Sequence, residues 1–275
     1  MRNIFAGNIA RYRKENGLTQ EELANKLGIT PQAVSKWETE QSMPDIAVLP
    51  NLAEILHISV DKLLGYNAHQ NDASYYENAY SSTDGYYWGV NPSQMCLKII
   101  SLMPPDKRLK VLDIGCGEGK DAVFFARCGY DVSAFDISDT GIEKTKRLAH
   151  SAGVRVNVFK ASVWDHRLDR QYDILYSSGV LHYIKPALRG EIFSNYRDHT
   201  NINGLNAFNA FVEKPFIAPA PENEEHSYLW RSGELLAYYR DWLIEDFSEQ
   251  IFDCRSSGVP HQHAMNTVYA RRKER

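Results

Sequence analysis

The segment 111-VLDIGCGEGKDAVFFA-126 constrains the possible fold more than any other part of the chain. It begins with a short apolar run typical of a buried strand, continues with glycines at every second position, and ends in a helical pattern. Strand-like and helical runs then alternate along the chain, which predicts a parallel sheet covered by helices on both faces. The predicted strands are 110–115, 131–138, 156–162, 172–178, 204–213, 243–252 and 264–272, and the predicted helices are 119–128, 140–152, 186–200 and 232–240.

The composition is that of a globular protein with room for two domains. The chain has 275 residues, 43% of them hydrophobic, and no apolar run approaches the roughly 18 residues of a membrane span, so we expect a cytoplasmic protein without membrane contact. Its four cysteines are scattered without a Cys-x-x-Cys pair, which argues against a zinc cluster or a disulfide framework. The net charge of −4 gives no general attraction to nucleic acid. Any DNA binding would therefore need a local surface.

A change in composition divides the chain. Residues 1–66 carry short helical patterns separated by turns, which predict a small all-α domain. In residues 67–84 Asn, Ser, Asp and Tyr replace aliphatic residues, which is typical of a linker or of a connection lying along the surface. Residues 85–275 contain the α/β pattern and form the predicted second domain.

Two consecutive helices of the first domain carry clear start and stop signals. Thr19 precedes the first helix, Glu22 completes a capping box, and Gly28 supplies the left-handed turn that ends it. Thr30 caps the second helix, with Pro31 at its first position. Such a pair can place its second helix in the major groove of DNA.

The segment 18-LTQEELANKLGITPQAVSKWETEQSMP-44 resembles the phage-repressor (Cro-like, XRE) helix-turn-helix family, and the resemblance covers residues 2–65. It implies an ion pair between Arg13 and Glu38, and homodimers that bind paired half-sites of double-stranded DNA. The residues that would approach the DNA are Gln20, Thr30, Pro31, Gln32, Ala33 and Lys36. The alternative is an interaction or dimerisation module, because residues 1–66 hold seven Lys and Arg against eight Asp and Glu.

The glycine-rich turn indicates which cofactor the α/β domain would hold. Lys120 stands where a dinucleotide-binding loop needs its third glycine, and no Gly-Lys-Ser/Thr follows, so neither a pyrophosphate loop nor a P-loop fits. Asp113 precedes the turn and favours a cationic cofactor without phosphates, a description that S-adenosylmethionine fits through its ammonium and sulfonium groups. The turn residues expected to bring bare backbone to it are Gly115, Cys116, Gly117 and Gly119.

The end of the second predicted strand adds a second acidic group. Asp136 lies 23 residues after Asp113, where it can accept hydrogen bonds from both ribose hydroxyls, and Ile137 can pack on the adenine face. The alternative is a purely structural turn with a solvent-facing Asp136.

Residues 85–273 resemble the class I S-adenosylmethionine-dependent methyltransferases, and more narrowly their tellurite-resistance (TehB-type) branch. The narrower resemblance rests on 111–138, 172–186, 232–235 and 268–273. It implies a Rossmann-like, seven-stranded, mostly parallel sheet whose last strand is antiparallel. It also implies that Ser177 and Ser178 bind the methionyl end through backbone groups. Ser162 stands where many members have an acidic residue near the adenine amine, so backbone at Ser162 or Val163 would serve instead.

The acceptor is expected beyond the carboxyl ends of the strands, where open α/β sheets bind ligands. His182 follows the fourth strand, either as an acceptor contact or as a cap of the next turn. His261 and His263 lie two residues apart and point to one face of the last strand; with no evident third ligand, we predict a hydrogen-bonding pair for an anionic or thiol-like acceptor and no metal. Arg255 matches an arginine of the TehB-type branch and would hold an oxyanion, unless it is a solvated surface residue.

The aromatic run 86-YYW-88 precedes the first strand. Trp88 and its neighbours would enclose the sulfonium by cation–π contact, with plain core packing as the alternative. The sequence therefore predicts a methyltransferase acting on a small molecule, such as tellurite, selenite or a thiol, with a fused DNA-binding domain. The alternative is a transcriptional regulator whose methyltransferase-like domain senses S-adenosylmethionine or a toxic ligand without turnover.

Overall fold

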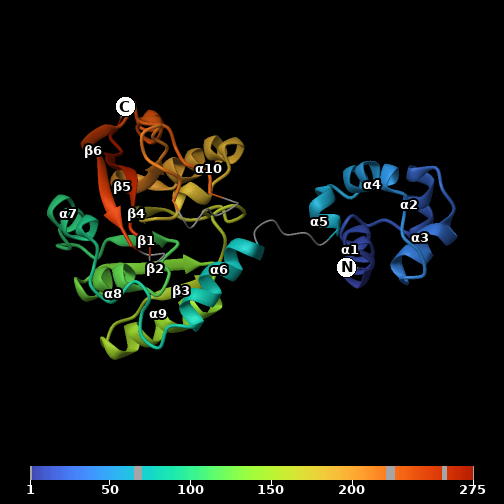
Figure 1. Cartoon of the computed structure of the whole chain (residues 1–275), viewed down its shortest axis with the longest axis horizontal. Helices are drawn as coiled ribbons and strands as arrows, with labels where there is room; N and C mark the ends of the chain where they lie inside the picture. The colour runs from blue at the N-terminus through green and yellow to red at the C-terminus, as the bar shows by residue number, and fades with distance from the viewer. Residues whose placement is uncertain (1, 65–69, 221–226, 256–258, 275) are drawn as a thin grey trace. The chain divides into compact units, whose positions relative to one another are not determined.

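The structure is a computed structural model that describes residues 2–64, 70–220, 227–255 and 259–274. The chain divides into two compact units, Met1–Asn71 and Asp72–Arg275 (Figure 1). The domain boundary expected after residue 66, and residues 67–69 of the expected linker, lie outside the described residues. Within the described ranges, no helix is both long enough and apolar enough to cross a membrane.

The first unit is a helical bundle, as predicted. Its elements are α1 (Arg2–Glu15), α2 (Gln20–Leu27), α3 (Pro31–Glu38), a 3-10 turn (Ile46–Val48), α4 (Leu49–Ile55) and α5 (Val60–Leu64). The predicted signals are confirmed: Thr19 and Glu22 form the capping box of α2, and Gly28 ends that helix with φ of +68°. The Thr30 hydroxyl accepts a hydrogen bond from the N–H of Ala33 and so caps α3. These caps fix the sharp turn between the two helices.

A buried ion pair stabilises this unit. Arg13 of α1 donates to both carboxylate oxygens of Glu38 at the end of α3, at 2.6 and 3.0 Å, and Gln20 donates to the same carboxylate at 2.8 Å. Burial alone would raise the pKa of Glu38, but the hydrogen bonds from Arg13 and Gln20 outweigh it and lower the pKa. The ion pair implied by the helix-turn-helix resemblance is therefore confirmed. Leu23 and Val34, both fully buried, pack in the core beside it.

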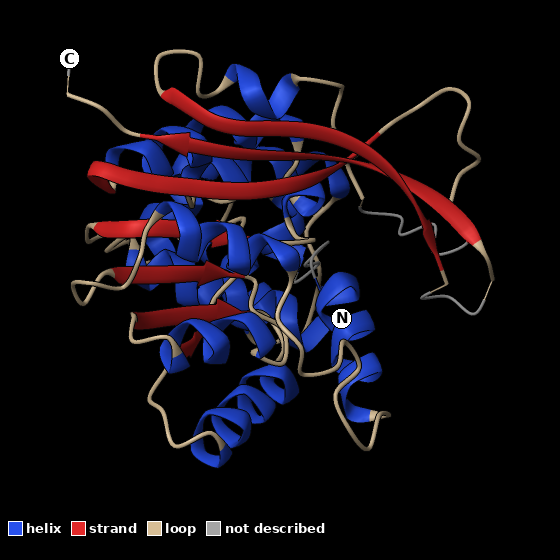
Figure 2. Cartoon of the chain, turned by 90° about the vertical axis from the view of Figure 1, so that its left-hand side faces the viewer, coloured by secondary structure: helices blue, strands red, loops and turns tan. Residues whose placement is uncertain are grey.

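The second unit is built on one seven-stranded sheet, in the order β3-β2-β1-β4-β5-β7-β6 (Figure 2). The strands are β1 (Lys110–Ile114), β2 (Asp131–Asp136), β3 (Asn157–Lys160), β4 (Tyr172–Ser177), β5 (Thr200–Val212), β6 (Leu243–Cys254) and β7 (His261–Arg271). The pairs among β1 to β5 are parallel, whereas β7 is antiparallel to both β5 and β6. The predicted α/β fold and its antiparallel last strand are confirmed. Figure 2 shows that the three longest strands, β5, β6 and β7, project past the four shorter ones.

Helices cover both faces of this sheet. They are α7 (Gln94–Leu102), α8 (Lys120–Arg127), α9 (Asp139–Ser151), α10 (Pro186–Asp198) and α11 (Glu234–Ala237), with a 3-10 turn at Leu181–Tyr183. One core cluster contains Ile99 of α7 and Phe125 of α8, and the other contains Phe193 of α10 and Leu235 of α11. The four predicted helices correspond to α8, α9, α10 and α11, whereas α7 is not predicted.

Of the two interpretations of this segment, the structure favours a connection that lies along the surface over an extended linker, because residues Gln70–Ser81 form the helix α6. All of α6 except its first two residues belongs to the second unit. Its Glu77 carboxylate accepts from Ser138 Oγ at 2.6 Å, at the cap of α9, and the hydroxyls of Tyr76 and Tyr183 lie 2.7 Å apart. A carboxylate at a helix N-terminus is stabilised by the unpaired N–H groups there. The low aliphatic content of residues 70–84 therefore reflects polar and aromatic docking on the second unit.

Candidate active site

A cavity of about 350 Å³ opens at the carboxyl ends of β1, β2 and β4, the place where open α/β sheets bind ligands. The predicted cofactor residues that line it are Asp113, Gly115, Cys116, Gly117, Asp136, Ile137, Ser162, Val163, Ser178 and Trp88. Two others, Gly119 and Ser177, are not among its lining residues. Gly119 is the N-cap of α8, and the Ser177 hydroxyl donates to the carbonyl of Ile114 at 2.9 Å, so both have structural roles.

The glycine-rich turn presents bare backbone to this cavity. Gly115 and Gly117 have φ of +73° and +55°, a region that side chains disfavour. A Cβ on Gly115 would lie 2.4 Å from Val180 Cγ2, and one on Gly117 would lie 2.9 Å from the Tyr80 hydroxyl. Conformation and space therefore both require glycine at these two positions.

Asp136, at the end of β2, contacts both the turn and the cavity. Its Oδ2 accepts from the N–H of Gly117 at 2.8 Å, and its Oδ1 from the N–H of Ser138 at 2.9 Å. Burial raises the pKa of Asp136, and these backbone hydrogen bonds oppose the rise. The residue is only 8% exposed, so the alternative of a solvent-facing aspartate is wrong. A carboxylate offers about four acceptor positions, which leaves Asp136 able to accept from two further donors.

Asp113, at the end of β1, is a buried carboxylate on the cavity wall and is 2% exposed. Within the described part of the chain, no group donates a hydrogen bond to its Oδ2. Burial, and then the nearby carboxylate of Asp121, raise the pKa of Asp113 well above its usual value. Leaving a buried acceptor unpaired costs about 1–3 kcal/mol. This side of the cavity is therefore complementary to a cation that supplies the missing partner.

Asp121, in the first turn of α8, is a cavity residue that the sequence analysis misses. Its carboxylate accepts from the Tyr176 hydroxyl and from the N–H of Ser93, each at 2.7 Å, and Lys120 Nζ lies 3.3 Å away. The sequence feature that could have indicated Asp121 is its position two residues after Gly119. A carboxylate in the first turn of a helix lies near the turn that precedes the helix.

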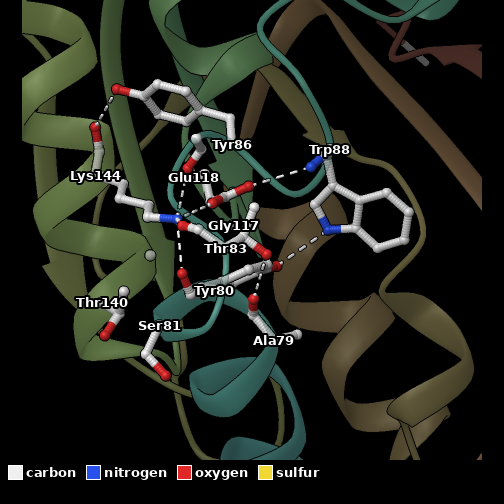
Figure 3. Close-up of polar contacts among 12 residues, drawn as sticks. Ala79, Tyr80, Ser81, Thr83, Tyr86, Trp88, Gly117, Glu118, Thr140 and Lys144 are labelled. Carbon is white, nitrogen blue, oxygen red and sulfur yellow. Dashed lines mark hydrogen bonds and ion pairs between the residues drawn. The ribbon is translucent and has the colours of Figure 1, made fainter.

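A buried ion pair fastens the segment 80–88 beside the cavity (Figure 3). Lys144 of α9 donates to Glu118 Oε1 at 2.8 Å, and the two side chains are 7% and 1% exposed. The same ammonium donates to the backbone carbonyls of Tyr80, Thr83 and Gly85, at 2.6, 3.0 and 2.7 Å. The other oxygen of Glu118 accepts from the N–H of Trp88 at 3.2 Å, and the Trp88 indole donates to the Tyr80 hydroxyl at 3.3 Å. One lysine thus connects the segment to both α9 and the glycine-rich turn.

Aromatic side chains form one wall of the cavity, as the sequence suggests. Only some of them come from the run 86–88, in which they were expected. Of the run 86–88 only Trp88 is a lining residue among those described, while Tyr86 packs over the Lys144 ammonium. Tyr76 and Tyr80 of α6 complete the wall. Their spacing of four residues places them on one helix face, a signal that the linker interpretation overlooks.

Residues 69–258 match the family described as tellurite resistance protein TehB. The chain belongs to the TehB family. Residues 9–63 match a family described as helix-turn-helix, which agrees with the bundle of the first unit.

Individual relatives agree with both assignments. The probable S-adenosyl-L-methionine-dependent methyltransferase TehB of Haemophilus influenzae is 25% identical over 143 residues, 52% of this chain and 49% of the relative, so the chain spans about half the length of that relative. The uncharacterized HTH-type transcriptional regulator YqaE of Bacillus subtilis is 41% identical over 61 residues, 22% of this chain and 53% of that protein. The crystal structure of TehB from Haemophilus influenzae superposes with a TM-score of 0.61 at 22% identity, over 72% of this chain and 67% of that one, which supports the fold.

His182 lies behind the cavity wall of this TehB-family domain. Its side chain is 4% exposed and packs on the rings of Tyr183 and Phe211, with centroids 4.1 and 4.7 Å away, and it is not a lining residue. Burial, and secondarily His263, lower the pKa of His182 to about 3. A histidine with this pKa stays neutral at physiological pH, so it lacks the titration that a general base near neutrality needs.

The predicted acceptor residues on the last strands also lie outside the cavity lining. His263 stacks on Phe211 with ring centroids 4.7 Å apart, and the Nε2 atoms of His261 and His263 lie 2.8 Å apart. Arg255 is exposed at the end of β6. Phe211, Phe252 and Met265 line the cavity on this side. The expectation that no third ligand accompanies the two histidines is wrong, because Cys254 Sγ lies within 4.8 Å of both.

Five of the six predicted DNA-contacting residues lie on α3 or at its N-cap, and the sixth, Gln20, begins α2. Thr30, Gln32 and Lys36 are exposed, and Pro31 and Ala33 are half-buried. Gln20 differs from the expectation, because its amide donates to Glu38 within the bundle. Its predicted phosphate contact would use the second amide hydrogen.

Proposed function

We propose that residues 72–275 bind S-adenosylmethionine and transfer its methyl group to a small-molecule acceptor. The observation that carries the proposal is the pair of buried carboxylates, Asp113 and Asp136, on the two strands beside the glycine-rich turn. The unpaired oxygen of Asp113 fits a cationic group of the cofactor, and the two remaining acceptor positions of Asp136 fit the ribose diol. The similarity to the probable S-adenosyl-L-methionine-dependent methyltransferase TehB of Haemophilus influenzae supports the same activity.

The residues of the chain act by positioning and by excluding water. Bound S-adenosylmethionine supplies an electrophilic methyl group. Asp113 and Asp136 would orient the cofactor, and Trp88 and Tyr80 would cover it from the segment held by Lys144. Holding two reactants in line removes much of the entropic barrier to transfer.

We infer that the acceptor is a soft, polarisable atom, as in a thiol or a selenium or tellurium compound. The side of the cavity formed by β5, β6 and β7 presents Phe211, Phe252 and Met265. Apolar and thioether groups favour a soft, polarisable acceptor atom over the hard nitrogen of an amine. An acceptor that arrives as a thiolate, with its proton already lost to solvent, needs no general base, which agrees with the neutral, buried His182.

Calorimetric titration with S-adenosylmethionine tests the cofactor site. Asp136→Ala removes two charge-assisted hydrogen bonds to the cofactor, each worth about 1.5–3 kcal/mol, so affinity should fall by at least about 100-fold. Asp139→Ala is the matched control, because that carboxylate is 71% exposed and pairs with Lys160 on the surface. Unchanged affinity in Asp136→Ala would refute the site.

Turnover is tested by release of S-adenosylhomocysteine in the presence of thiols, selenite, tellurite and small amines. The proposal expects release with at least one chalcogen acceptor and none with the amines. Tight cofactor binding without turnover on any acceptor would favour a regulator that senses the cofactor.

We also propose that residues 2–64 bind double-stranded DNA through α3. Gln32 and Lys36 are exposed and four residues apart, so they share one helix face. A gel-shift series with the promoter region of the chain's own gene tests this. Lys36→Ala should reduce the slope of log affinity against log salt by about 1, and Gln32→Ala should weaken the specific complex by about 1–3 kcal/mol. Lys26→Ala, at the exposed end of α2, is the control, and absence of any shift at low salt would contradict the proposal.

A further inference from the structure

The paired ends of β6 and β7 bring together three side chains that are common metal ligands. In the register of this hairpin Cys254 lies opposite His261, and Phe252 lies opposite His263. Residues two apart on a strand point to the same face, so Cys254, His261 and His263 share one face with Phe252. One ligand atom from each of the three lies within 4.8 Å of the others.

The distance between the two histidine nitrogens of this Cys–His–His cluster is close to the separation of two ligands on a tetrahedral ion. The Nε2 atoms of His261 and His263 are 2.8 Å apart. Zinc–nitrogen bonds of about 2.0–2.1 Å at tetrahedral angles separate two ligand nitrogens by about 3.3 Å. A shift of about half an ångström, within reach of side-chain rotation, would therefore admit the ion.

A second contact prepares His261 for ligation. Its Nδ1 lies 2.8 Å from the carbonyl oxygen of Val259. Because a carbonyl oxygen can only accept, Nδ1 carries the proton and the lone pair of Nε2 faces His263. Histidines that bind metals usually donate their other ring N–H to such a carbonyl, which fixes the tautomer and the ring orientation.

We propose that Cys254, His261 and His263 bind a zinc-class divalent ion, with a fourth position open to water or to an exogenous ligand. One thiolate and two imidazoles are the donor set of borderline-soft ions and do not suit Mg²⁺ or Ca²⁺, which take oxygen ligands. None of the ion's ligands is among the described residues that line the cofactor cavity, so ion binding can be measured whether or not the proposed methyl transfer occurs.

The site adjoins the acceptor side of the cavity. The His263 ring stacks on Phe211 at 4.7 Å between centroids and lies 5.7 Å from Phe252, and both phenylalanines line the cavity. A bound ion would hold His263 in place and therefore order this wall. It would also join the ends of β6 and β7 across the residues between Cys254 and His261.

Cobalt substitution tests the proposal on the whole chain. After treatment with a chelator, Co²⁺ is titrated in and the visible ligand-field bands and the near-ultraviolet thiolate-to-cobalt band are recorded, followed by displacement with Zn²⁺. We expect one equivalent to bind with tetrahedral bands and a thiolate band. Cys254→Ser should abolish the thiolate band, and His263→Ala should weaken Co²⁺ binding by more than about 100-fold.

Cys128→Ser is the matched control, since this thiol is also half-buried and lies at the end of α8. It should leave the spectrum unchanged. Absence of stoichiometric Co²⁺ or Zn²⁺ binding, or a thiolate band that survives in Cys254→Ser, would overturn the proposal. Calorimetry measures the affinity of the same samples for S-adenosylmethionine. A metal-site variant that has misfolded would be recognised because it would also lose this affinity.

Discussion

At the scale of single residues, Asp113 combines a stability cost with a binding role. Its carboxylate is buried with one oxygen that no described group satisfies, and burial together with Asp121 raises its pKa. In the cofactor-free protein a raised pKa means that ionisation of Asp113 opposes folding. Its contribution to stability is present at low pH and is lost as the pH rises through the folded-state pKa. A cationic ligand has the opposite preference, because it binds the ionised form.

Asp113→Asn should therefore separate stability from binding. The amide removes the buried charge while its oxygen still accepts from the backbone of Ala122, so at pH 7 the cofactor-free variant should be more stable by about 1 kcal/mol, or about 2–4 °C in Tm. Affinity for S-adenosylmethionine should fall by about 10- to 100-fold, because a charge-assisted contact is lost. Scanning calorimetry and titration calorimetry measure the two effects. Lower stability combined with undiminished affinity would show that Asp113 is purely structural.

The pH dependence of affinity provides a second readout for the same residue. In the unaltered chain, affinity should weaken as the pH falls through the raised pKa of Asp113, because the neutral acid does not attract a cation. In Asp113→Asn this dependence should disappear. Titrations at a series of pH values on both sides of neutrality, with folding checked by circular dichroism, compare the two.

At the scale of elements, the sequence predicts what depends on local pattern and misses what depends on distant contacts. Each predicted strand of the sheet matches an observed one, because apolar periodicity and turn residues are local signals. The helix α6 is missed because Glu77 and the tyrosines dock on residues about 60 and 100 positions away. Cys254 is missed as a partner of the histidines because only the register of β6 with β7 brings it opposite His261. The spacing of residues along the chain does not predict how two strands pair.

The segment 80–88 allows a prediction at this scale, because one buried ion pair anchors it. Lys144→Met would leave the carboxylate of Glu118 buried without its charged partner, at a cost of about 3–5 kcal/mol. Affinity for S-adenosylmethionine should also fall, since Trp88 and Tyr80 lose their anchor. Thermal unfolding and calorimetric titration check both effects.

A double-mutant cycle shows whether the pair itself is responsible. Lys144→Met combined with Glu118→Gln should be less destabilised than the sum of the single variants, by about 0.5–3 kcal/mol. Lys146→Met is the control on the same helix, because its ion pair with Glu143 is exposed and the change should stay within about 0.5 kcal/mol. Additive single changes would mean that Lys144 acts only through the carbonyls it binds.

At the scale of the whole molecule, the two units hold the two proposed activities separately. Among the residues that the structure describes, those lining the cavity run from Tyr76 to Met265 and all belong to the second unit. The proposed DNA-contacting residues belong to α2, α3 and the turn between them, all in the first unit. A ligand shifts an equilibrium only through its different affinity for the two states. The enzyme proposal requires no such difference, because the described residues that line the cavity all belong to the second unit.

The enzyme proposal therefore predicts that saturating S-adenosylmethionine changes DNA affinity by less than about twofold, whereas a cofactor-sensing regulator requires a coupling of about 5- to 150-fold. Fluorescence anisotropy of a labelled promoter fragment, with and without cofactor, measures the factor. Because coupling between two binding sites is reciprocal, saturating DNA should likewise leave the calorimetric affinity for the cofactor unchanged. A change of fivefold or more in DNA affinity on adding the cofactor, absent in Asp136→Ala, would contradict the prediction. DNA binding would then depend on occupation of the cavity, as in a cofactor-sensing regulator.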